Sequence, residues 1–566
     1  MLPVHGEREF PKLAYNARMK ETSSSAANAE TAVSADDVRT CVRVLHAIEA
    51  DRSLLARLTQ EQRRELLTLA GLVAKPERHN LVRMAKAFRR AEREAARERD
   101  RQVVEQTGLR IQRRSAVYAP LWLEPPKPED LDDRPELHQE RTCYVCKKSF
   151  AKMHRYYDSM CDACGDFNYA KREQTADLSG HYALVTGARV KIGFQASLKL
   201  LRAGAHVIVT TRFPIDAAER YSKEQDFAEF GGRLQIHGLD LRHTPSVEIF
   251  TRFLLERLPR LDYILNNACQ TVRRPAGFFQ HLLAREAESV AALPLELRGA
   301  LAGHEELRRI LEGAAHGFDA VAHRPGGMAH DFGAVAHRLD GMAPGLPGPA
   351  GSGLAASGAV TRHAEGLLHS AALSQRRYLD EDFQDGAALF PADRYDEDRQ
   401  QVDLRAINSW RLRLHEVATP ELLEVQLVNA IAPYILNARL KPLMVRTPGA
   451  HKHIVNVSAM EGQFYRATKT DKHPHTNMAK AALNMMTRTS APDFVKDGIH
   501  MNAVDTGWVT DEDPAVHAAR KAEEGFSPPL DIIDGAARIV DPVFVGRLTG
   551  KHVWGQFLKD YRPAPW

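Results

Sequence analysis

Short apolar runs alternate with helical patterns from Leu178 to the end of the chain. An apolar run of four or five residues bounded by turn signals predicts a buried strand, and a repeat near 3.6 residues predicts a helix. The runs that predict strands are 182–185, 205–209, 234–237, 261–265 and 453–457. Strands that alternate with helices in this way form a parallel sheet with helices on both faces. The pattern therefore predicts an α/β fold with a doubly wound, Rossmann-type sheet.

The first part of the chain has a different pattern. Residues 1–33 are polar and rich in Ala and Ser, which predicts a mobile leader. Helical periodicity over 34–119 predicts a helical region, and its stretch 82–101 holds eight Lys or Arg and four Asp or Glu. We interpret that stretch as a solvated helix face, in preference to a phosphate-binding surface. Clustered prolines then predict a stiff linker over 120–140.

Composition limits the class of protein. The 566 residues suggest three to four domains, and 77 basic against 73 acidic residues leave a net charge of +4. Such a balance makes nucleic acid an unexpected partner. No run of about 18 apolar residues is present, and the first ten residues lack the apolar stretch of a secretory signal, so no membrane association is expected. Six cysteines in this length fit a reducing compartment, and we expect a cytoplasmic protein.

Four of the six cysteines form two CxxC pairs in the segment 141–175. Cys143 with Cys146 and Cys161 with Cys164 can each place two thiolates on one side of a metal ion. Together they complete a tetrahedral Zn²⁺ shell with no position left for water, so we expect a structural zinc module. Cys164 lies 18 residues before the first predicted strand. We therefore expect the module near the amino ends of the strands, away from the ligand-binding edge. His154 is an alternative ligand, although a loop histidine is the simpler interpretation.

A candidate phosphate-binding loop follows the first predicted strand. Its sequence from Thr186 to Gly193 is TGARVKIG, and a strand, glycine turn and helix in this order can hold a pyrophosphate on backbone N–H groups. The second strand ends in Thr211-Arg212, with no acidic residue to bind a ribose 2′-hydroxyl. The guanidinium of Arg212, together with Arg189 in the loop, suits a 2′-phosphate. The loop therefore favours NADP(H) over NAD(H), unless both arginines are surface residues.

These motifs resemble those of the short-chain dehydrogenase/reductase (SDR) family. Further matches are Asp240-Leu241 after the third strand, Asn267-Ala268 after the fourth, Asn429, Ser458, Lys480 and a segment 502–510 that contains Gly507. The resemblance implies a set of cofactor-binding residues. They are Thr186, Gly187, Arg189, Lys191, Ile192, Gly193, Thr211, Arg212, Asp240, Leu241, Asn267, Ala268, Lys480 and Gly507. The resemblance also implies catalytic roles for Asn429, Ser458 and Lys480, a carbonyl or alcohol substrate, and a possible homo-oligomer formed through the SDR core.

The resemblance covers two separated parts of the chain, 178–275 and 418–566. The intervening 276–417 is then an insertion between the fourth strand and the next helix. Within it, 313–360 is rich in Gly, Ala, Pro and His with an imperfect 14-residue repeat, and we expect this stretch to be disordered. The parts 279–288 and 402–410 have structured patterns that could form a substrate lid, or an outer subdomain with no such role.

Three departures from the family pattern affect the chemistry. Lys191 replaces a loop glycine, Cys269 replaces a second glycine, and Thr476 stands four residues before Lys480, where the family has its catalytic tyrosine. A threonine hydroxyl is far less acidic than a phenol, so Thr476 cannot take over proton donation, although it can hydrogen-bond a substrate or water.

Three nearby side chains are alternative proton donors. They are Tyr465, His473 and His475, and for each of them a packing role is the competing interpretation. The sequence thus predicts an NADP(H)-dependent oxidoreductase with an altered proton donor. The competing hypotheses are a catalytically inactive NADP(H)-binding sensor or scaffold and, less favoured, a nucleic-acid-binding module.

Overall fold

The computed structural model describes residues 33–120, 134–322, 362–384, 386–464 and 469–566. The chain divides into two compact units, Met1–Glu94 and Ala95–Trp566. The two units are described separately below. Among the helices of the described residues, none is both long and apolar enough to cross a lipid bilayer.

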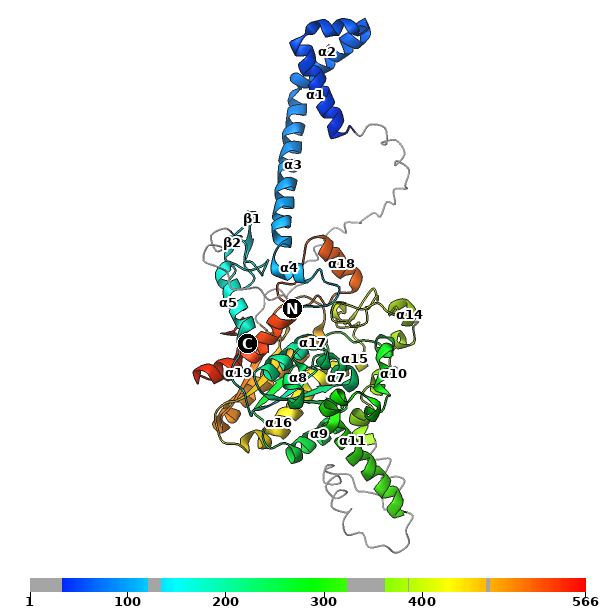
Figure 1. The fold of residues 1–566 in the computed structure, drawn as a ribbon, viewed down its shortest axis with the longest axis vertical. Coiled ribbons are helices and arrows are strands. Elements are labelled where there is room, and N and C mark those ends of the chain that lie inside the picture. The colour runs from blue at the N-terminus through cyan, green and yellow to red at the C-terminus, as the bar shows by residue number, and fades with distance from the viewer. Residues whose placement is uncertain (1–32, 121–133, 323–361, 385, 465–468) are drawn as a thin grey trace, which may run out of the picture. The chain divides into compact units, whose positions relative to one another are not determined.

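The first unit contains residues 34–94 of the predicted helical region 34–119. Helices α1 (Ala35–Ala50) and α2 (Gln60–Ala74) are followed by α3 (Arg78–Glu105), which continues into the second unit (Figure 1). Ser34 and Thr59 cap α1 and α2 with reciprocal side-chain and backbone hydrogen bonds. No residue of α1 or α2 is buried. Local capping, and not a packed core, therefore defines these helices.

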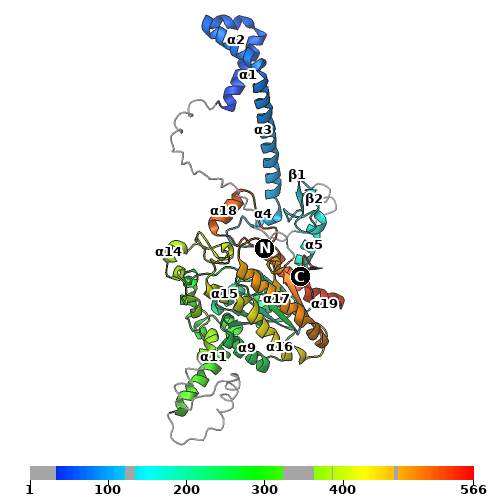
Figure 2. The same cartoon turned by 180° about the vertical axis from the view of Figure 1, so that it is seen from behind.

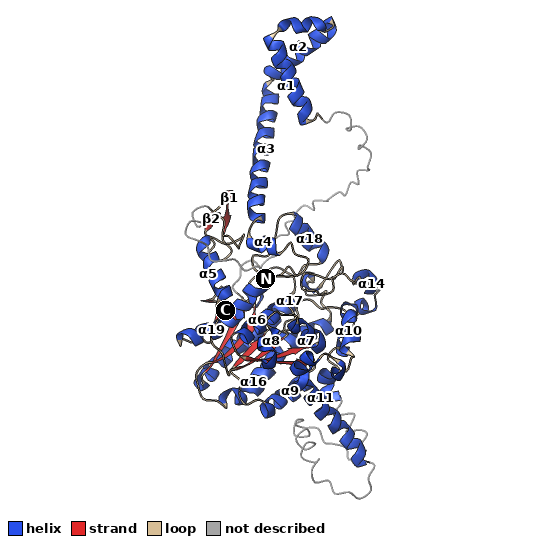
Figure 3. Cartoon of the chain, in the orientation of Figure 1, coloured by secondary structure: helices blue, strands red, loops and turns tan. Residues whose placement is uncertain are grey.

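The second unit is built around an eight-stranded sheet (Figure 3, red). Its strands are β3 (Tyr182–Thr186), β4 (His206–Thr211), β5 (Leu234–Gly238), β6 (Tyr263–Asn266), β7 (Lys452–Ser458), β8 (Ile499–Asp505), β9 (Phe557–Lys559) and β10 (Arg562–Ala564). They lie in the order β10-β9-β8-β7-β6-β3-β4-β5, and every pairing is parallel except β9 with β10. The order reverses between β3 and β6, so the predicted doubly wound Rossmann-type fold is confirmed.

Helices cover both faces of this sheet (Figures 1 and 2). One face carries α6 (Lys191–Arg202), α7 (Pro214–Ser222), α19 (Ile532–Thr549) and part of α11 (Leu295–Ala322); the other carries α9 (Thr244–Arg257), α16 (Ala432–Val445) and α17 (Pro474–Phe494). Side chains alternate between the faces: Val185 joins the first core cluster and Leu184 the second. Burial on both faces explains why strands such as β3 and β6 are short and almost entirely apolar.

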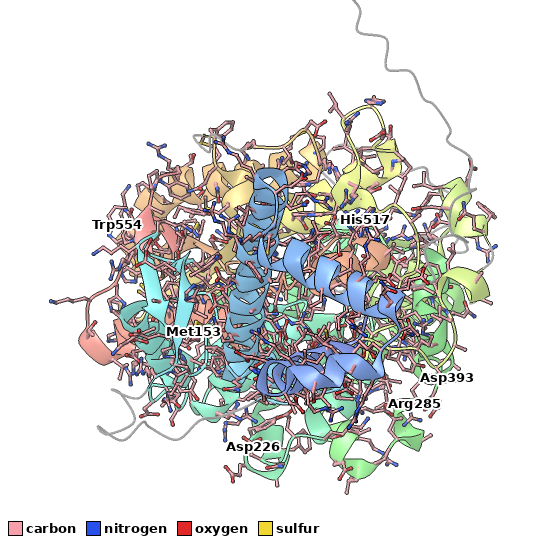
Figure 4. All side chains as sticks on the ribbon, turned by 90° about the horizontal axis from the view of Figure 1, so that it is seen from above. Met153, Asp226, Arg285, Asp393, His517 and Trp554 are labelled. Carbon is pink, nitrogen blue, oxygen red and sulfur yellow. The ribbon has the colours of Figure 1, made fainter. Side chains whose placement is uncertain are left out.

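The cysteine pairs belong to a small hairpin module. Strands β1 (Glu136–Thr142) and β2 (Ser149–Lys152) pair antiparallel and precede α5 (Asp162–Glu173). Met153, at the end of β2, is buried in the core of this module and is labelled in Figure 4. β1 begins inside the range predicted as linker, of which 121–133 lies outside the described residues.

Further helices lie before the hairpin module, in the insertion and in connections between core elements. They include α4 (Gly108–Gln112), α8 (Phe227–Phe230), α10 (Gln280–Glu286), α14 (Gly386–Leu389), α15 (Thr419–Gln426) and α18 (Ala515–Glu523). Helix α11 extends into the range 313–360, the rest of which, from residue 323, lies outside the described residues, as does the leader 1–32. The insertion is therefore partly helical and joins the core at α11.

Candidate functional site

The loop between β3 and α6 lies at the carboxyl edge of the sheet. Gly187 has φ +66°, and a Cβ there would lie 2.8 Å from the backbone of Ala268. A Cβ on Gly193 would overlap Asn267 Nδ2 and the carbonyl oxygen of Gly187. Asn267 Nδ2 in turn donates hydrogen bonds to the carbonyl oxygens of Thr186 and Gly187, at 3.0 and 3.1 Å. The loop is thus fixed against the end of β6 by contacts that only glycines permit.

We expect Gly193→Ala to destabilise the protein by about 1–3 kcal/mol, because the added methyl group must displace Asn267 or the loop backbone. Gly299→Ala is the matched control, since Gly299 lies in α11 with nothing within 4 Å of its Cβ position. It should stabilise the helix by about 0.5–1 kcal/mol. Urea unfolding of both variants measures the two changes. Equal effects of the two substitutions would contradict the packing described for the loop.

Lys191 occupies a backbone conformation that suits glycine. Its φ is +55°, in the left-handed region that costs a non-glycine residue about 1 kcal/mol or more. Its ammonium group lies 4.0 Å from Asp398 in the insertion. Burial disfavours the charge, but the carboxylates of Glu512 and Asp398 outweigh it and raise the pKa of Lys191. This lysine therefore stays charged beside the start of α6, whose first residues have no side-chain cap.

The two arginines of the predicted phosphate site differ in their contacts. Arg189 is buried, and its Nη1 donates to Asp216 Oδ2 at 2.7 Å. Arg212 lies over the ring of Phe279, 4.5 Å from its centroid, and no described residue hydrogen-bonds or ion-pairs with its guanidinium. Burial and the charge of Arg242 lower the pKa of Arg212 to about 10, so it remains a cation at neutral pH. Arg189 is thus partly engaged by Asp216, whereas all guanidinium donors of Arg212 remain free of bonds to the described residues and can bind an anion.

The adenine side of the predicted site is formed by Asp240 and Leu241, just after β5. The Asp240 carboxylate is buried and bonded to Arg242, with Nη2 to Oδ2 at 2.6 Å. Arg242 also donates to Glu424 Oε1 at 2.8 Å, and the backbone N–H of Asp240 donates to Gly366 in the insertion at 2.8 Å. Burial opposes ionisation of Asp240, but Arg242 lowers its pKa. The Asp240 carboxylate thus already forms an ion pair with Arg242.

A cavity of about 570 Å³ lies over these residues. Its lining includes most of the predicted cofactor residues: Gly187, Arg189, Lys191, Ile192, Gly193, Thr211, Arg212, Asp240, Leu241, Asn267 and Ala268. Thr186, Gly507 and the four predicted catalytic residues in the described part of the chain are not among its lining. Thr186 lies beneath the loop, where its Oγ1 accepts a hydrogen bond from Ala268 N at 3.0 Å.

The insertion forms much of the opposite wall of this cavity. It contributes Phe278, Phe279, Asp396, Gln400, Gln401, Val402, Asp403, Arg405 and Asn408. Arg274 pairs with Asp403, and Arg220 Nη1 donates to the carbonyl oxygen of Asp398 at 2.8 Å. The family motifs do not indicate these residues, although the structured patterns at 279–288 and 402–410 were a signal for part of the wall.

Asn429 and Ser458 are both buried. Asn429 lies in a π-helical turn, η9 (Leu427–Ile431), a distortion that often occurs at functional sites. Its Oδ1 accepts a hydrogen bond from Gln270 N at 2.7 Å, which ties it to the segment after β6. Ser458 ends β7, and its Oγ donates to Asn484 Oδ1 at 2.6 Å. Both residues therefore have partners within the protein.

Lys480 and Thr476 lie on the buried face of α17. Lys480 Nζ donates to the carbonyl oxygen of Val457 at 2.7 Å, so its ammonium lies against the end of β7. Thr476 Oγ1 is buried with no hydrogen-bond partner in the described structure. At this edge of the sheet the Lys480 ammonium is therefore hydrogen-bonded, whereas the Thr476 hydroxyl is not.

Of the three alternative proton donors, the two histidines lie in the described part of the chain. Tyr465 lies outside the described residues. The His473 ring stacks on Trp410, with centroids 3.9 Å apart, and its Nδ1 lies 2.9 Å from the carbonyl oxygen of Trp410. His475 is buried, with Nε2 3.5 Å from Glu421 Oε1. His473 thus serves packing against the insertion.

The four predicted metal-ligating cysteines meet in one cluster, with their sulfur atoms within 4.8 Å of one another. Cys146 Sγ and Cys161 Sγ are 3.7 Å apart. A tetrahedral zinc with Zn–S bonds near 2.3 Å requires about 3.8 Å between sulfurs. The backbone N–H of Lys148 lowers the pKa of Cys146 to about 7, which favours the thiolate. The spacing of the Cys146 and Cys161 sulfurs therefore matches that expected for two ligands of one tetrahedral zinc ion.

His154 does not belong to this cluster. Its Nδ1 accepts hydrogen bonds from the backbone N–H groups of Tyr156 and Tyr157, both at 3.1 Å, and its Nε2 lies 3.2 Å from Asp166. Burial lowers the pKa of His154 to about 4. Both ring nitrogens are therefore used in holding the loop.

The expected position of the cysteine module was wrong. The Tyr144 hydroxyl accepts a hydrogen bond from Trp508 N at 3.0 Å, directly after Gly507 at the carboxyl end of β8. The module therefore lies at the ligand-binding edge of the sheet. The reason is α5, whose twelve residues span about 18 Å along α19 and carry the chain to the start of β3.

Gly507 illustrates how closely the module and the sheet edge pack. Its φ is +75°, and its N–H donates to Asp505 Oδ1 at 3.0 Å. A Cβ there would overlap Leu530 and lie 3.2 Å from the Tyr144 hydroxyl. The module thus packs, through Tyr144, against the segment that the family resemblance assigns to the nicotinamide.

Two segments of the chain match known family profiles. Residues 181–307 match a profile described as short chain dehydrogenase, and residues 405–526 match one described as Enoyl-(Acyl carrier protein) reductase. Both segments coincide with the sheet and its crevice. These two segments of the α/β domain are therefore similar to the short-chain dehydrogenase/reductase family, in agreement with the motifs.

Individual proteins are similar over different lengths. An uncharacterized protein of Acanthamoeba polyphaga mimivirus is 28% identical over 433 residues, 74% of each chain. The (-)-isopiperitenone reductase of Mentha piperita is 37% identical over 90 residues, and retinol dehydrogenase 14 of Mus musculus 33% over 114. These matches cover 15% and 18% of this chain, and this chain spans only 28% and 34% of those two relatives.

Solved structures with a similar chain course include a dehydrogenase/reductase from Sinorhizobium meliloti, at 17% identity and a TM-score of 0.37. A short chain dehydrogenase from Burkholderia cenocepacia, solved in complex with NADP, is 15% identical with a TM-score of 0.36. The alignments cover 68% of this chain and 94% and 96% of the two structures.

Proposed function

We propose that the protein is an NADP(H)-dependent oxidoreductase that transfers hydride between the nicotinamide and a carbonyl or alcohol substrate. The observation that carries the proposal is Arg212, a charged guanidinium without a polar protein partner at the edge of the cavity. Guanidinium groups bind phosphate through paired hydrogen bonds. No acidic side chain follows β4 in the place where it would bind a ribose 2′-hydroxyl.

The residues at the crevice fit such a cofactor. The uncapped start of α6, which includes Gly193, offers backbone N–H groups to a pyrophosphate, and Lys191 adds a positive charge there. The N–H of Gly187 instead donates to the carbonyl oxygen of Thr210 at 2.9 Å. Arg212 would hold the 2′-phosphate, Leu241, Asn267 and Ala268 would flank the nucleoside, and Gly507 the nicotinamide. A bound NADPH would supply hydride; the protein would orient it and hold the substrate.

The chemistry of the chain's own residues centres on the carboxyl end of β7. Ser458 Oγ can turn from Asn484 to donate a hydrogen bond to a substrate carbonyl. The unsatisfied Thr476 hydroxyl can hold a water or the substrate oxygen. Lys480 contributes positive charge close to both, since it binds the carbonyl oxygen of the residue preceding Ser458. In this arrangement water, and not Thr476, delivers the proton.

A catalytically inactive NADP(H)-binding sensor or scaffold is the second candidate. Thr476 at the tyrosine position favours it, as does the engagement of Lys480 with the backbone. Both candidates require the same cofactor, and they differ only in turnover.

NADPH consumption separates the two candidates. Screened across aldehydes and ketones, the wild-type protein should oxidise NADPH with at least one substrate class, and Lys480→Ala should lower that rate by about 100-fold or more. Lys496→Ala, an exposed lysine just beyond α17, is the matched control and should retain the rate. Turnover that survives Lys480→Ala unchanged would contradict the proposed active site. NADPH binding without turnover on any substrate would favour the sensor.

We also propose that Cys143, Cys146, Cys161 and Cys164 hold a structural Zn²⁺ ion. The sulfur spacing and the hydrogen bond from Cys161 N to Cys143 Sγ, at 3.4 Å, support this assignment. Four thiolates leave no coordination position for a substrate, so the ion would act on stability and not on the reaction.

A further inference from the structure

Three histidines meet at the opposite end of the sheet from the cavity. His453 and His500 are paired residues near the amino ends of the parallel strands β7 and β8, and His552 lies in the connection between α19 and β9. One ring nitrogen from each lies within 4.8 Å of the others. Trp554, labelled in Figure 4, marks the same connection. No family motif or proposed catalytic step uses these residues.

The ring nitrogens are arranged as in a metal site. His453 Nε2 and His552 Nδ1 lie 3.0 Å apart, close to the roughly 3.3 Å expected between two nitrogens that bind one tetrahedral zinc at about 2.0 Å. His500 Nδ1 lies 3.2 Å from the carbonyl oxygen of Lys452, to which it can donate its proton. That bond would leave Nε2 as the coordinating atom, and a backbone carbonyl partner of this kind is usual for metal-bound histidines.

Gly546 in α19 keeps space beside two of these nitrogens. A Cβ at this position would lie 2.5 Å from His552 Nδ1 and 2.8 Å from His453 Nε2. Any other residue would therefore project into the cluster. His451 adjoins it as well, with its ring centroid 4.9 Å from that of His552 and a buried Nδ1 that lacks a hydrogen-bond partner.

We propose that His453, His500 and His552 bind a second divalent transition-metal ion, Zn²⁺ in the cell. Imidazole ligands suit zinc, nickel and copper, and the absence of carboxylates from the cluster argues against calcium or magnesium. The ion would link β7, β8 and the connection after α19, and it would thereby stabilise the amino edge of the sheet. This site is independent of the cysteine cluster and of the cofactor.

Metal content of the full-length protein tests the proposal. After dialysis against Zn²⁺ and removal of free metal, the wild-type chain should carry two zinc ions, Cys143→Ser one, and His552→Gln one. His181→Gln is the matched control, because His181 stacks on Tyr263 outside the cluster, and it should retain two. If the cysteines bind no zinc but the histidines do, the wild type should carry one zinc ion and His552→Gln none. Equal zinc in wild type and His552→Gln would overturn the proposal.

Two further measurements guard against a folding defect in the variant. Gly546→Ala keeps all three imidazoles but fills the space beside them, and it should weaken Zn²⁺ binding in the Cys143→Ser background about 100-fold or more. Co²⁺ bound to Cys143→Ser should show visible bands without thiolate-to-cobalt charge transfer, and these bands should vanish in the Cys143→Ser, His552→Gln double variant. Bands that persist in a double variant with wild-type circular dichroism would refute the three-histidine site.

Discussion

Arg212→Asp is expected to weaken NADPH binding by about 100-fold while NADH binding changes less than about threefold. A hydrogen bond to a charged group contributes about 1.5–3 kcal/mol, and each 1.4 kcal/mol corresponds to a tenfold change in affinity. The free guanidinium over Phe279 offers such bonds only to the 2′-phosphate, which NADH lacks. The introduced carboxylate repels that phosphate and can accept a hydrogen bond from the ribose hydroxyl of NADH. Fluorescence titration with both nucleotides measures the difference.

The control for Arg212→Asp is Arg488→Asp, which makes the same change of charge on an exposed position of α17. It should leave both affinities unchanged. Two outcomes would refute the assignment of the 2′-phosphate site. One is a wild-type protein that binds NADPH and NADH equally, and the other is a parallel loss of both nucleotides in Arg212→Asp.

Cys143→Ser is expected to remove one zinc ion per chain and to lower the melting temperature by about 3–5 °C. Structural zinc contributes its binding free energy to folding, and a loss of about 3–5 kcal/mol corresponds to roughly 1 °C per kcal/mol in a unit as long as Ala95–Trp566, because the entropy of unfolding grows with chain length. Cys143 is fully buried in a core cluster with Leu109, Tyr156, Leu530 and Ile532. The module therefore cannot loosen without exposing apolar surface that it shares with α4 and α19. Metal analysis and thermal unfolding followed by circular dichroism measure both effects.

Cys41→Ser is the matched control for the cysteine cluster. Cys41 is an exposed thiol in α1, outside the cluster. This variant should keep both the zinc content and the melting temperature of the wild type. A Cys143→Ser protein with undiminished zinc would show that the four sulfurs do not form a metal site.

Sequence patterns predicted above all those strands of the sheet that contain a continuous run of apolar residues. Strands β3, β4, β6 and β7 each contain a short apolar run, and β3 to β7 were each predicted to within two residues at either end. β8 was missed because its sequence, IHMNAVD, interrupts the apolar run with polar residues. In the structure these are buried and bonded, as Asn502 Nδ2 is to the carbonyl oxygen of Val553 at 2.7 Å. Such partners come from distant segments, so local periodicity does not indicate them.

In the candidate site, too, the sequence indicated the residues of local motifs but not the contacts between distant segments. The motif spacing indicated the glycine loop, Arg212 and the four cysteines, because each pattern reflects a local chemical requirement. The structure places the loop and Arg212 at the cavity and the four cysteines in one cluster. The motif spacing did not indicate that Lys480 binds the carbonyl oxygen of Val457, or that 396–408 of the insertion lines the cavity. It also misplaced the cysteine module, since a separation of 18 residues gives a length but not the direction in which α5 runs.

The interrupted sheet has a consequence for how the chain folds. β6 and β7 are neighbours, yet residues 267–451 separate them, whereas residues 239–262 suffice to connect β5 with β6. The entropic cost of closing a loop grows only with the logarithm of its length, so this connection, about three doublings longer, costs roughly 1.8 kcal/mol more. The seam at the centre of the sheet is therefore only slightly harder to close than an ordinary crossover. Pairing across it depends on contacts remote in sequence, and such contacts slow folding far more than they reduce stability.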